Sequence, residues 1–269
     1  MPLTGRAAEE FLCQARMEVV GRIRRASNTT LLARLELDGL QADAVYKPVA
    51  GERPLWDFPD GTLANREVAS YAVSEATGWG IVPPTVLRDG PAGPGMCQLW
   101  VRAEAHPEPL VDILPGGDVP PGWVRSLDLS EFADRPATLA HADHVMLRRM
   151  AILDVIINNA DRKVGHILPA PGGEVHGVDH GVAFHVDDKV RTVLWGWGGQ
   201  SLAGECVAVA QALAVDLAPG AASGLRSQLT RLLSGPEVDA TAARARRLVA
   251  HPRYPRPGHR WPAVPWPLF

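Results

Sequence analysis

Two aspartates stand beside short strand-like segments in the polar stretch 153–184. Asp161 follows the apolar helical run 150–157 and precedes the β-type run 166–168, and Asp179 follows a second β-type run, 175–178. Aspartates at the ends of paired strands can converge on one divalent cation, and phosphoryl transfer needs such a cation to neutralise the charge of the phosphate groups. The stretch therefore predicts an active site for phosphate chemistry.

A lysine stands in the predicted strand 42–49, well upstream of this stretch. Lys47 lies between Tyr46 and Pro48 and is one of only three lysines among the 27 basic residues of the 269-residue chain. Its ammonium group is a compact charge that suits contact with nucleotide phosphates, and a surface lysine at a strand end is the alternative. Glu67, in the first turn of the predicted helix 66–77, either pairs with Lys47 or complements the helix dipole.

Taken in order, these segments resemble the phosphatidylinositol 3-/4-kinase superfamily. The similarity covers about residues 17–215 and is closest to the type II 4-kinases, with an uncharacterised bacterial branch as the expected place of the chain. It rests on the strand around Lys47, the helix 67–78 and the hinge-like segment 95–101. It also rests on the D-x-x-x-x-N-x-D-R run that ends at Arg162 and the D-H-G run that begins at Asp179.

The resemblance implies ATP as the cofactor, together with Mg²⁺ or Mn²⁺. Asp161 would orient or deprotonate the attacking hydroxyl, while Arg162 would stabilise the loop or the developing phosphate charge. Asp179 and His166 would be the metal ligands. Besides Lys47 and Glu67, the expected nucleotide contacts are a hairpin tip over the phosphates and the hinge at the adenine edge: Ser27, Asn28, Thr29, Leu99, Trp100 and Val101.

His166 is the position at which the chain departs from the family. Five residues after the catalytic aspartate the family carries a metal-binding asparagine. A neutral imidazole is a poor ligand for Mg²⁺ and a better one for Mn²⁺ or Zn²⁺. We therefore expect activity to favour manganese and to fall below about pH 6.5, where an unperturbed imidazole protonates. A non-catalytic, nucleotide-binding pseudokinase is the alternative that this substitution suggests.

Two further activities compete with phosphate transfer. The same fold can support the transfer of AMP in place of phosphate. A metal-dependent hydrolase is the rival from another enzyme class, because several potential ligands gather in the same stretch: His166, His176, Asp179, His180 and His185. That cluster lacks the helical i, i+4 ligand pair of zincins, and it leaves Lys47 and the hinge unexplained.

The order of segments predicts an α+β, bilobal fold of the atypical protein-kinase type. Alternating and β-branched runs place an antiparallel, nucleotide-binding N-lobe at residues 1–101, and the Pro/Gly-rich stretch 102–137 is expected to be an irregular hinge and linker insertion. Apolar residues three or four apart predict a mostly helical C-lobe at 138–250 that carries the catalytic and metal loops. The tail 251–269 is rich in proline and tryptophan and is either a strap packed on the C-lobe or an exposed segment that binds a partner.

Composition narrows the partners and the compartment. A net charge of −3 with no basic run argues against a dedicated nucleic-acid binder. Three widely spaced cysteines suggest neither a disulfide framework nor a zinc site, which favours a cytoplasmic location. No transmembrane segment or signal peptide is expected. The predicted partners are therefore a nucleotide and an unidentified phosphoacceptor, which is a protein, a lipid headgroup or a small molecule.

Overall fold

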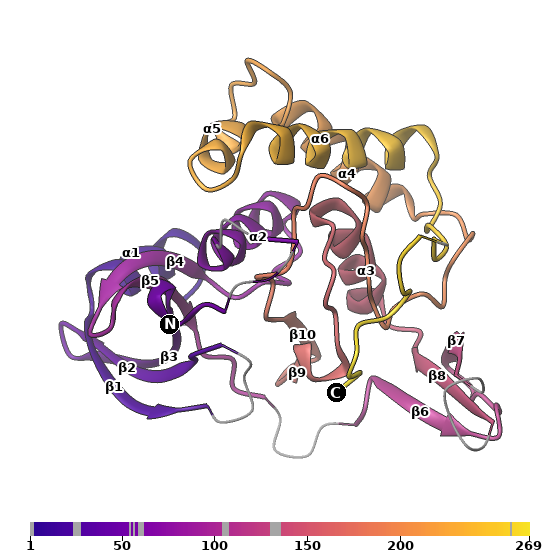
Figure 1. Cartoon of the computed structure of the whole chain (residues 1–269), viewed down its shortest axis with the longest axis horizontal. Coiled ribbons are helices and arrows are strands. Elements are labelled where there is room, and N and C mark those ends of the chain that lie inside the picture. Colours follow the sequence, from indigo (N-terminus) through magenta and orange to yellow (C-terminus); the bar gives the residue numbers. More distant parts are fainter. Residues whose placement is uncertain are drawn as a thin grey trace.

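An antiparallel sheet of five strands forms the first part of the chain. The computed structural model describes residues 3–23, 28–53, 55, 57–58, 62–103, 108–129, 136–258 and 260–269. The sheet has the order β1-β2-β3-β5-β4 (Figure 1). Its strands are β1 (Arg16–Arg22), β2 (Leu31–Leu37), β3 (Leu40–Pro48), β4 (Thr85–Gly90) and β5 (Gly93–Leu99). Side chains alternate along β3, so that Tyr46 and Pro48 are buried on one face and Lys47 projects from the other.

Two helices accompany this sheet. Helix α1 (Gly5–Gln14) buries Phe11 and Leu12 against Leu35 of β2 and Cys97 of β5. Helix α2 (Leu63–Thr77) lies between the sheet and the helices of the second half of the chain (Figure 1). Because it packs on both sides, α2 buries polar residues such as Ser70 and Ser74 in addition to its apolar face.

The start of α2 differs from the sequence prediction. The sequence predicted a helix that begins at Arg66, but the helix begins at Leu63. The backbone N–H groups of Leu63 and Ala64 donate to the two carboxylate oxygens of Glu52, at 3.1 and 2.8 Å. A carboxylate from the segment after the 3-10 turn η1 (Val49–Gly51) therefore replaces the local cap.

The middle of the chain forms a second sheet where the sequence predicted an irregular insertion. Strands β6 (Val111–Pro115), β7 (Trp123–Asp128) and β8 (Ala137–Ala142) pair antiparallel in the order β6-β8-β7. The predicted long helix of the C-lobe consequently starts later, as α3 (Val145–Ile157). The turns between these strands contain many Gly and Pro residues, which masked the strand pattern in the sequence.

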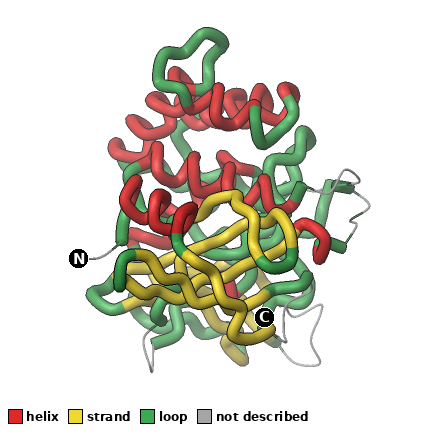
Figure 2. The backbone as a smooth tube through the Cα atoms, turned by 90° about the vertical axis from the view of Figure 1, so that its left-hand side faces the viewer, coloured by secondary structure: helices red, strands yellow, loops and turns green. Residues whose placement is uncertain are grey.

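Helices and one short hairpin make up the remainder. After α3 come the 3-10 turn η3 (Val164–His166) and the hairpin of β9 (Ile167–Ala170) and β10 (Glu174–Gly177). Helices α4 (Gly204–Asp216), α5 (Leu225–Thr230) and α6 (Gly235–Ala250) follow. The main hydrophobic core joins α2, α3, α4 and α6, and Figure 2 shows helices gathered at one end of the molecule and strands at the other.

The proline-rich tail runs back along the second half of the chain as a strap. The N–H groups of Thr192 and Val164 donate to the carbonyls of Ala263 and Leu268, and Leu268 is buried. Trp266 nevertheless remains 77% exposed.

The mixed α+β class is confirmed, with antiparallel sheets in the first half of the chain and helices concentrated in the second. Among the helices of the described residues, none combines the length and the apolar content that a bilayer span requires.

Candidate functional site

Lys47 connects two carboxylates that are far apart in the sequence. Its ammonium nitrogen lies 2.7 Å from Glu67 Oε1 and 2.7 Å from Asp179 Oδ1. Burial by itself would lower the pKa of Lys47, but the charges of Asp179 and Glu67 more than offset this effect and raise its pKa. Lys47 therefore stays protonated and holds α2 and the loop after β10 in a fixed relation to β3.

Glu67 is placed to orient this lysine. Its side chain is 2% exposed, and its second oxygen accepts the backbone N–H of His180 at 2.8 Å. The sequence left two roles open for Glu67, pairing with Lys47 or complementing the helix dipole. The structure shows the pairing, because α2 begins at Leu63, three residues before the predicted start, and the Lys47 ammonium donates to Glu67 Oε1 at 2.7 Å.

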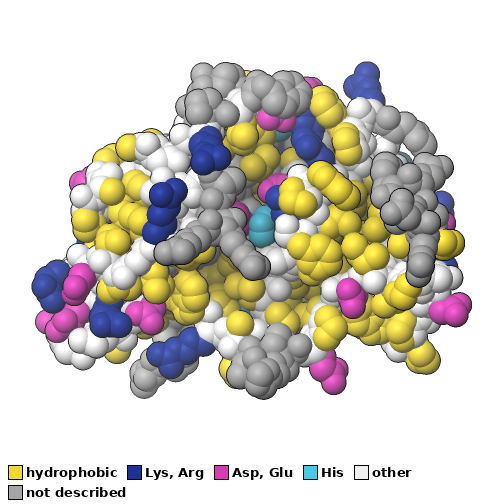
Figure 3. All heavy atoms as spheres, turned by 60° about the horizontal axis from the view of Figure 1, so that its bottom comes forward, with side chains coloured by type: hydrophobic (Ala, Val, Ile, Leu, Met, Phe, Trp, Pro, Cys, Tyr) yellow, Lys and Arg dark blue, Asp and Glu magenta, His cyan; other side chains and the backbone are white. Residues whose placement is uncertain are grey.

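A small cavity brings together residues from five separate segments. It has a volume of about 50 Å³ and is lined by Lys47, Glu67, Asp161 and Asp179, and also by Asn28 and Thr29 from the hairpin before β2. Ser27 lies outside the described residues. Figure 3 shows a hollow on this side of the molecule where acidic, basic and histidine side chains are visible among apolar ones. Among the described residues, the arrangement gathers one cation, Lys47, and four carboxylates around a single space, since Glu52 also lines it.

Asn28 and Thr29, which precede β2, are hydrogen-bonded to the segment that follows β3. The Thr29 N–H donates to the Gly51 carbonyl at 3.2 Å, and the Asn28 side chain accepts the Arg53 N–H at 3.0 Å. A Cβ atom at Gly51 would lie 2.5 Å from the Cβ of Thr29, so only glycine allows this close approach. The contacts fix Asn28 and Thr29 at the rim of the cavity.

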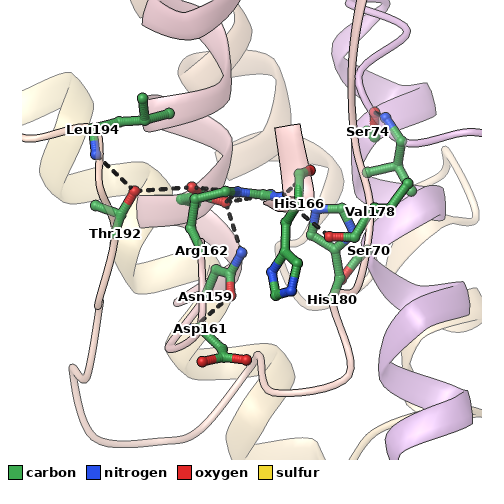
Figure 4. Close-up of polar contacts among 12 residues, drawn as sticks. Ser70, Ser74, Asn159, Asp161, Arg162, His166, Val178, His180, Thr192 and Leu194 are labelled. Carbon is green, nitrogen blue, oxygen red and sulfur yellow. Dashed lines mark hydrogen bonds and ion pairs between the residues drawn. The ribbon is translucent and has the colours of Figure 1, made fainter. Parts of the chain in front are cut away.

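Asp161 carries a perturbed carboxyl group. Burial raises its pKa to about 6, Asp179 adds to this shift, and the Lys163 and Arg191 charges oppose it. The Asp161 N–H donates to Asn159 Oδ1 at 3.0 Å, and Figure 4 shows the Asp161 carboxylate pointing away from the buried Arg162 network. A carboxyl group with a pKa near 6 can accept a proton at neutral pH, which suits a general base.

Arg162 is buried and faces the interior. It is fully enclosed and forms an ion pair with Asp154 at 2.8 Å. It also donates to the carbonyls of His166 and Val178, at 3.3 and 3.2 Å. Of the two roles that the sequence allowed, this geometry supports stabilisation of the loop. The guanidinium does not line the cavity and lies where it cannot stabilise developing phosphate charge there.

Asp179 and His166 face each other across the loop. The Asp179 Oδ2 and His166 Nε2 atoms are 3.5 Å apart, and Asp179 is 48% exposed. The Lys47 charge holds the pKa of Asp179 well below its usual range, whereas burial lowers the pKa of His166 to about 4. A stable carboxylate therefore stands beside a neutral imidazole. The expected loss of activity below pH 6.5 through protonation of His166 does not follow from this environment.

The other histidines of this stretch do not converge on a metal site. His176 contacts the Gly80 carbonyl, His180 lies 2.6 Å from the Arg162 guanidinium, and His185 lies edge-on to Phe58. Within the described parts of the chain, no group of three His, Cys, Asp or Glu side chains is arranged to hold a metal ion. The ligand cluster that the hydrolase alternative predicted is therefore not found among the described residues.

The hinge residues line a different cavity. Leu99, Trp100 and Val101 border a space of about 550 Å³ together with Pro84, near the β9–β10 hairpin. The Leu99 N–H donates to the Pro84 carbonyl and the Trp100 N–H donates to the Asp43 carbonyl. These two N–H groups are thus engaged within the protein, and contact between the hinge and an adenine ring stays a prediction.

Comparison with known proteins places the chain in a family. No family model matches it. Over 267 residues the chain is 47% identical to Protein Rv2133c of Mycobacterium tuberculosis, and the match covers 96% of this chain and 94% of that protein. The chain belongs to the Rv2133c family. Among solved structures, the Helicobacter pylori proinflammatory kinase CtkA aligns with 88% of this chain and 97% of its own, with 12% identity and a TM-score of 0.41. Membership of the phosphatidylinositol 3-/4-kinase superfamily stays a prediction.

Sequence analysis missed two residues that support this site in the Rv2133c-family chain. Glu52 lines the cavity and caps α2, and no local motif announced it. Arg66 is buried beside Glu67 and donates to the Ala183 carbonyl and to Glu237 of α6, both at 2.6 Å. An arginine next to the pairing glutamate, in a helix with no other basic residue, was the available signal for the second.

Proposed function

We propose that the chain is an ATP-dependent phosphotransferase that moves the γ-phosphate of ATP to a hydroxyl group. The observation that carries this proposal is the Lys47 ammonium, 2.7 Å from both Glu67 and Asp179, in one cavity with Asp161. A lysine paired in this way can hold nucleotide phosphates, and a nearby aspartate can accept the proton of the attacking hydroxyl.

The donor set around Asp179 fits a divalent cation bound together with a nucleotide. Asp179 remains ionised and partly exposed, and His166 remains neutral. Mg²⁺ uses one or two protein ligands and completes its shell with phosphate oxygens and water, whereas an imidazole also suits Mn²⁺. Asp179 and His166 would hold the cation, which would neutralise charge on the β- and γ-phosphates.

Each of the other residues then has a defined task. Lys47 binds the phosphates, and Glu67 keeps its ammonium group oriented. Asn28 and Thr29 close the cavity above the phosphates. Asp161, with a pKa near 6, is ionised at neutral pH and takes the proton of the acceptor hydroxyl. The acceptor is a protein, a lipid headgroup or a small molecule. The free cysteines Cys13, Cys97 and Cys206 suit the reducing cytoplasm that we propose as its location.

Two alternative functions would use the same nucleotide site. His166 replaces the asparagine of related kinases, which keeps a pseudokinase that binds ATP without turnover as the second candidate. Transfer of AMP would use the same Lys47 and Asp179 contacts with the nucleotide turned in the site.

ATP binding with and without a divalent cation tests the proposal. We expect ATP to stabilise the protein against heat only when Mg²⁺ or Mn²⁺ is present, and Asp179→Asn to abolish this stabilisation. Asp239→Asn, which changes an exposed carboxylate on α6, is the matched control and should behave as the parent does. Equal stabilisation with and without metal, or none in either case, would refute the proposed site. Binding without transfer of phosphate or AMP would identify a pseudokinase.

A further inference from the structure

A cavity of about 820 Å³ lies between the segment 187–190, the end of α6 and the tail. Its walls include Trp195 and Trp261, and the Trp195 indole N–H donates to the Ala263 carbonyl at 2.8 Å. The Lys189 ammonium lies 4.5 Å from the centroid of the Trp261 ring. The volume falls within the range of about 300–1,000 Å³ that is usual for small-molecule sites.

Cationic side chains from three distant segments line this cavity. Lys189 follows the metal loop, Arg247 belongs to α6, and Arg256 and Arg260 belong to the tail. Asp188, which also lines the cavity, already accepts hydrogen bonds from Arg247 and from the buried Arg244, both at 2.8 Å.

The two tail arginines retain charge that can bind a ligand. Both are exposed, and in the part of the chain that the structure describes neither forms an ion pair. The Arg256 guanidinium packs over Gly199. A Cβ atom at Gly199 would lie 2.7 Å from that guanidinium, and the φ angle of +88° also favours glycine there. Among the described residues, four cationic side chains (Lys189, Arg247, Arg256 and Arg260) and two carboxylates (Asp187 and Asp188) line this cavity, and the Lys189 ammonium also pairs with Asp57 at 3.2 Å. The lining is thus net positive, although the chain as a whole has a net charge of −3.

The cavity adjoins the loop that carries Asp161. The Lys189 N–H donates to Asn158 Oδ1 at 2.8 Å, and the Arg191 N–H donates to the Asn159 carbonyl at 3.1 Å. The N–H of Arg162 in turn donates to the Arg191 carbonyl. The segment that forms one wall of the cavity is therefore hydrogen-bonded to the loop of Asp161, and a molecule seated in the cavity would contact the segment that holds this loop in place.

We propose that this cavity binds the phosphate group of a soluble, phosphorylated small molecule that is the acceptor of the reaction. The inference rests on the proposed phosphotransferase function. Several cations facing one space favour a multiply charged phosphate, and guanidinium groups bind its oxygens in pairs. The two indole rings provide a surface for a planar or apolar part of the same molecule.

Titration calorimetry with inorganic pyrophosphate, in the absence of ATP and metal, tests the site on the full chain. We expect binding to the parent and at least tenfold weaker binding to the double variant Arg256→Ala/Arg260→Ala. Arg246→Ala removes an exposed arginine of α6 that does not line the cavity, and it should bind as the parent does. Equal affinity of the double variant and the parent would overturn the proposal, with retained melting temperatures showing that both are folded.

Two parallel measurements separate this site from the nucleotide site and from a lipid surface. Pyrophosphate binding that is lost in Lys47→Met but kept in the double arginine variant would place the anion at the nucleotide site and overturn the inference. ATP binding with metal, measured on the double arginine variant, should match the parent. If neither the parent nor any variant binds ATP, but the parent binds pyrophosphate through the two arginines, the proposed anion site stands and the kinase proposal fails. Binding only to vesicles that contain anionic phospholipid, with none to pyrophosphate, would replace the soluble acceptor by a membrane.

Discussion

Asp154→Asn tests whether Arg162 supports the catalytic loop from within. Both side chains of the pair are 0% exposed, and the guanidinium donates to Asp154 at 2.8 and 3.0 Å. Asp154 also accepts the Asn159 side-chain amide at 2.9 Å. The substitution leaves the Arg162 charge buried without a counterion, which costs about 3–5 kcal/mol. At roughly 2–4 °C per kcal/mol for a protein of this size class, the melting temperature should fall by about 6–20 °C.

An exposed ion pair supplies the control for this experiment. Glu205→Gln breaks the pair between Arg149 and Glu205, whose carboxylate is 47% exposed. Exposed pairs contribute about 0–1 kcal/mol, so this variant should melt close to the parent. Thermal and urea unfolding, followed by circular dichroism, measure both variants. If Asp154→Asn lowers the free energy of unfolding by less than about 1 kcal/mol, the buried ion pair does not stabilise the loop and the reasoning is wrong.

A double variant separates the structural role of Arg162 from a catalytic one. Asp154→Leu/Arg162→Met replaces both charges by apolar side chains, so no buried charge is left unpaired and much of the lost stability should return. If this variant is folded and still transfers phosphate, Arg162 acts through the loop alone. A folded variant without activity would return a direct role to the guanidinium.

Three further outcomes are expected. Since burial raises the pKa of Asp161 to about 6, the transfer rate should fall as the pH drops through 6, by about tenfold per pH unit below it. The variant His166→Asn should keep this inflection, because the pKa of His166 is lowered to about 4. Loss of the inflection in that variant would assign it to the imidazole instead. Glu52→Gln should lower the free energy of unfolding by about 1 kcal/mol through a weaker cap on α2, measured by urea titration, and an unchanged midpoint would show that the cap is dispensable. Arg66→Met should lower the free energy of unfolding by about 3 kcal/mol, because the partly buried Glu237 carboxylate loses its cationic partner. In the background of Glu237→Gln the same substitution should lower this free energy by less, whereas additive losses would disprove the coupling.

The local pattern of the chain was enough to predict much of the nucleotide side of the site. Alternation along 42–49 placed Lys47 on a strand, and helical periodicity over 66–77 placed Glu67 on the following helix. The order of Asp161 and Asp179 around a hairpin predicted that both would face one space, where the structure places them. These features depend on side chains that are close in sequence to the elements which position them, so a single sequence carries them.

Features that depend on distant partners could not be predicted in this way. Glu52 caps a helix that begins eleven residues later, and Arg66 donates to Glu237, 171 residues further along the chain. Neither pairing leaves a periodic signal. The strands of the middle sheet were likewise hidden, because short strands between Pro/Gly-rich turns gain their stability from cross-strand pairing and not from local propensity.

The sequence by itself therefore determined which chemical groups the chain can offer, namely a strand lysine, a helix glutamate, two loop aspartates and a histidine between them. Only the tertiary structure decided the state of those groups. Burial raises the pKa of Asp161 and lowers that of His166, and it encloses Arg162. The exposure of a side chain and the charges that surround it arise from segments brought together by folding, and these quantities set proton affinity. For the same reason the cavity of Arg256 and Arg260 exists only once the tail has packed beside α6 and the segment 187–190.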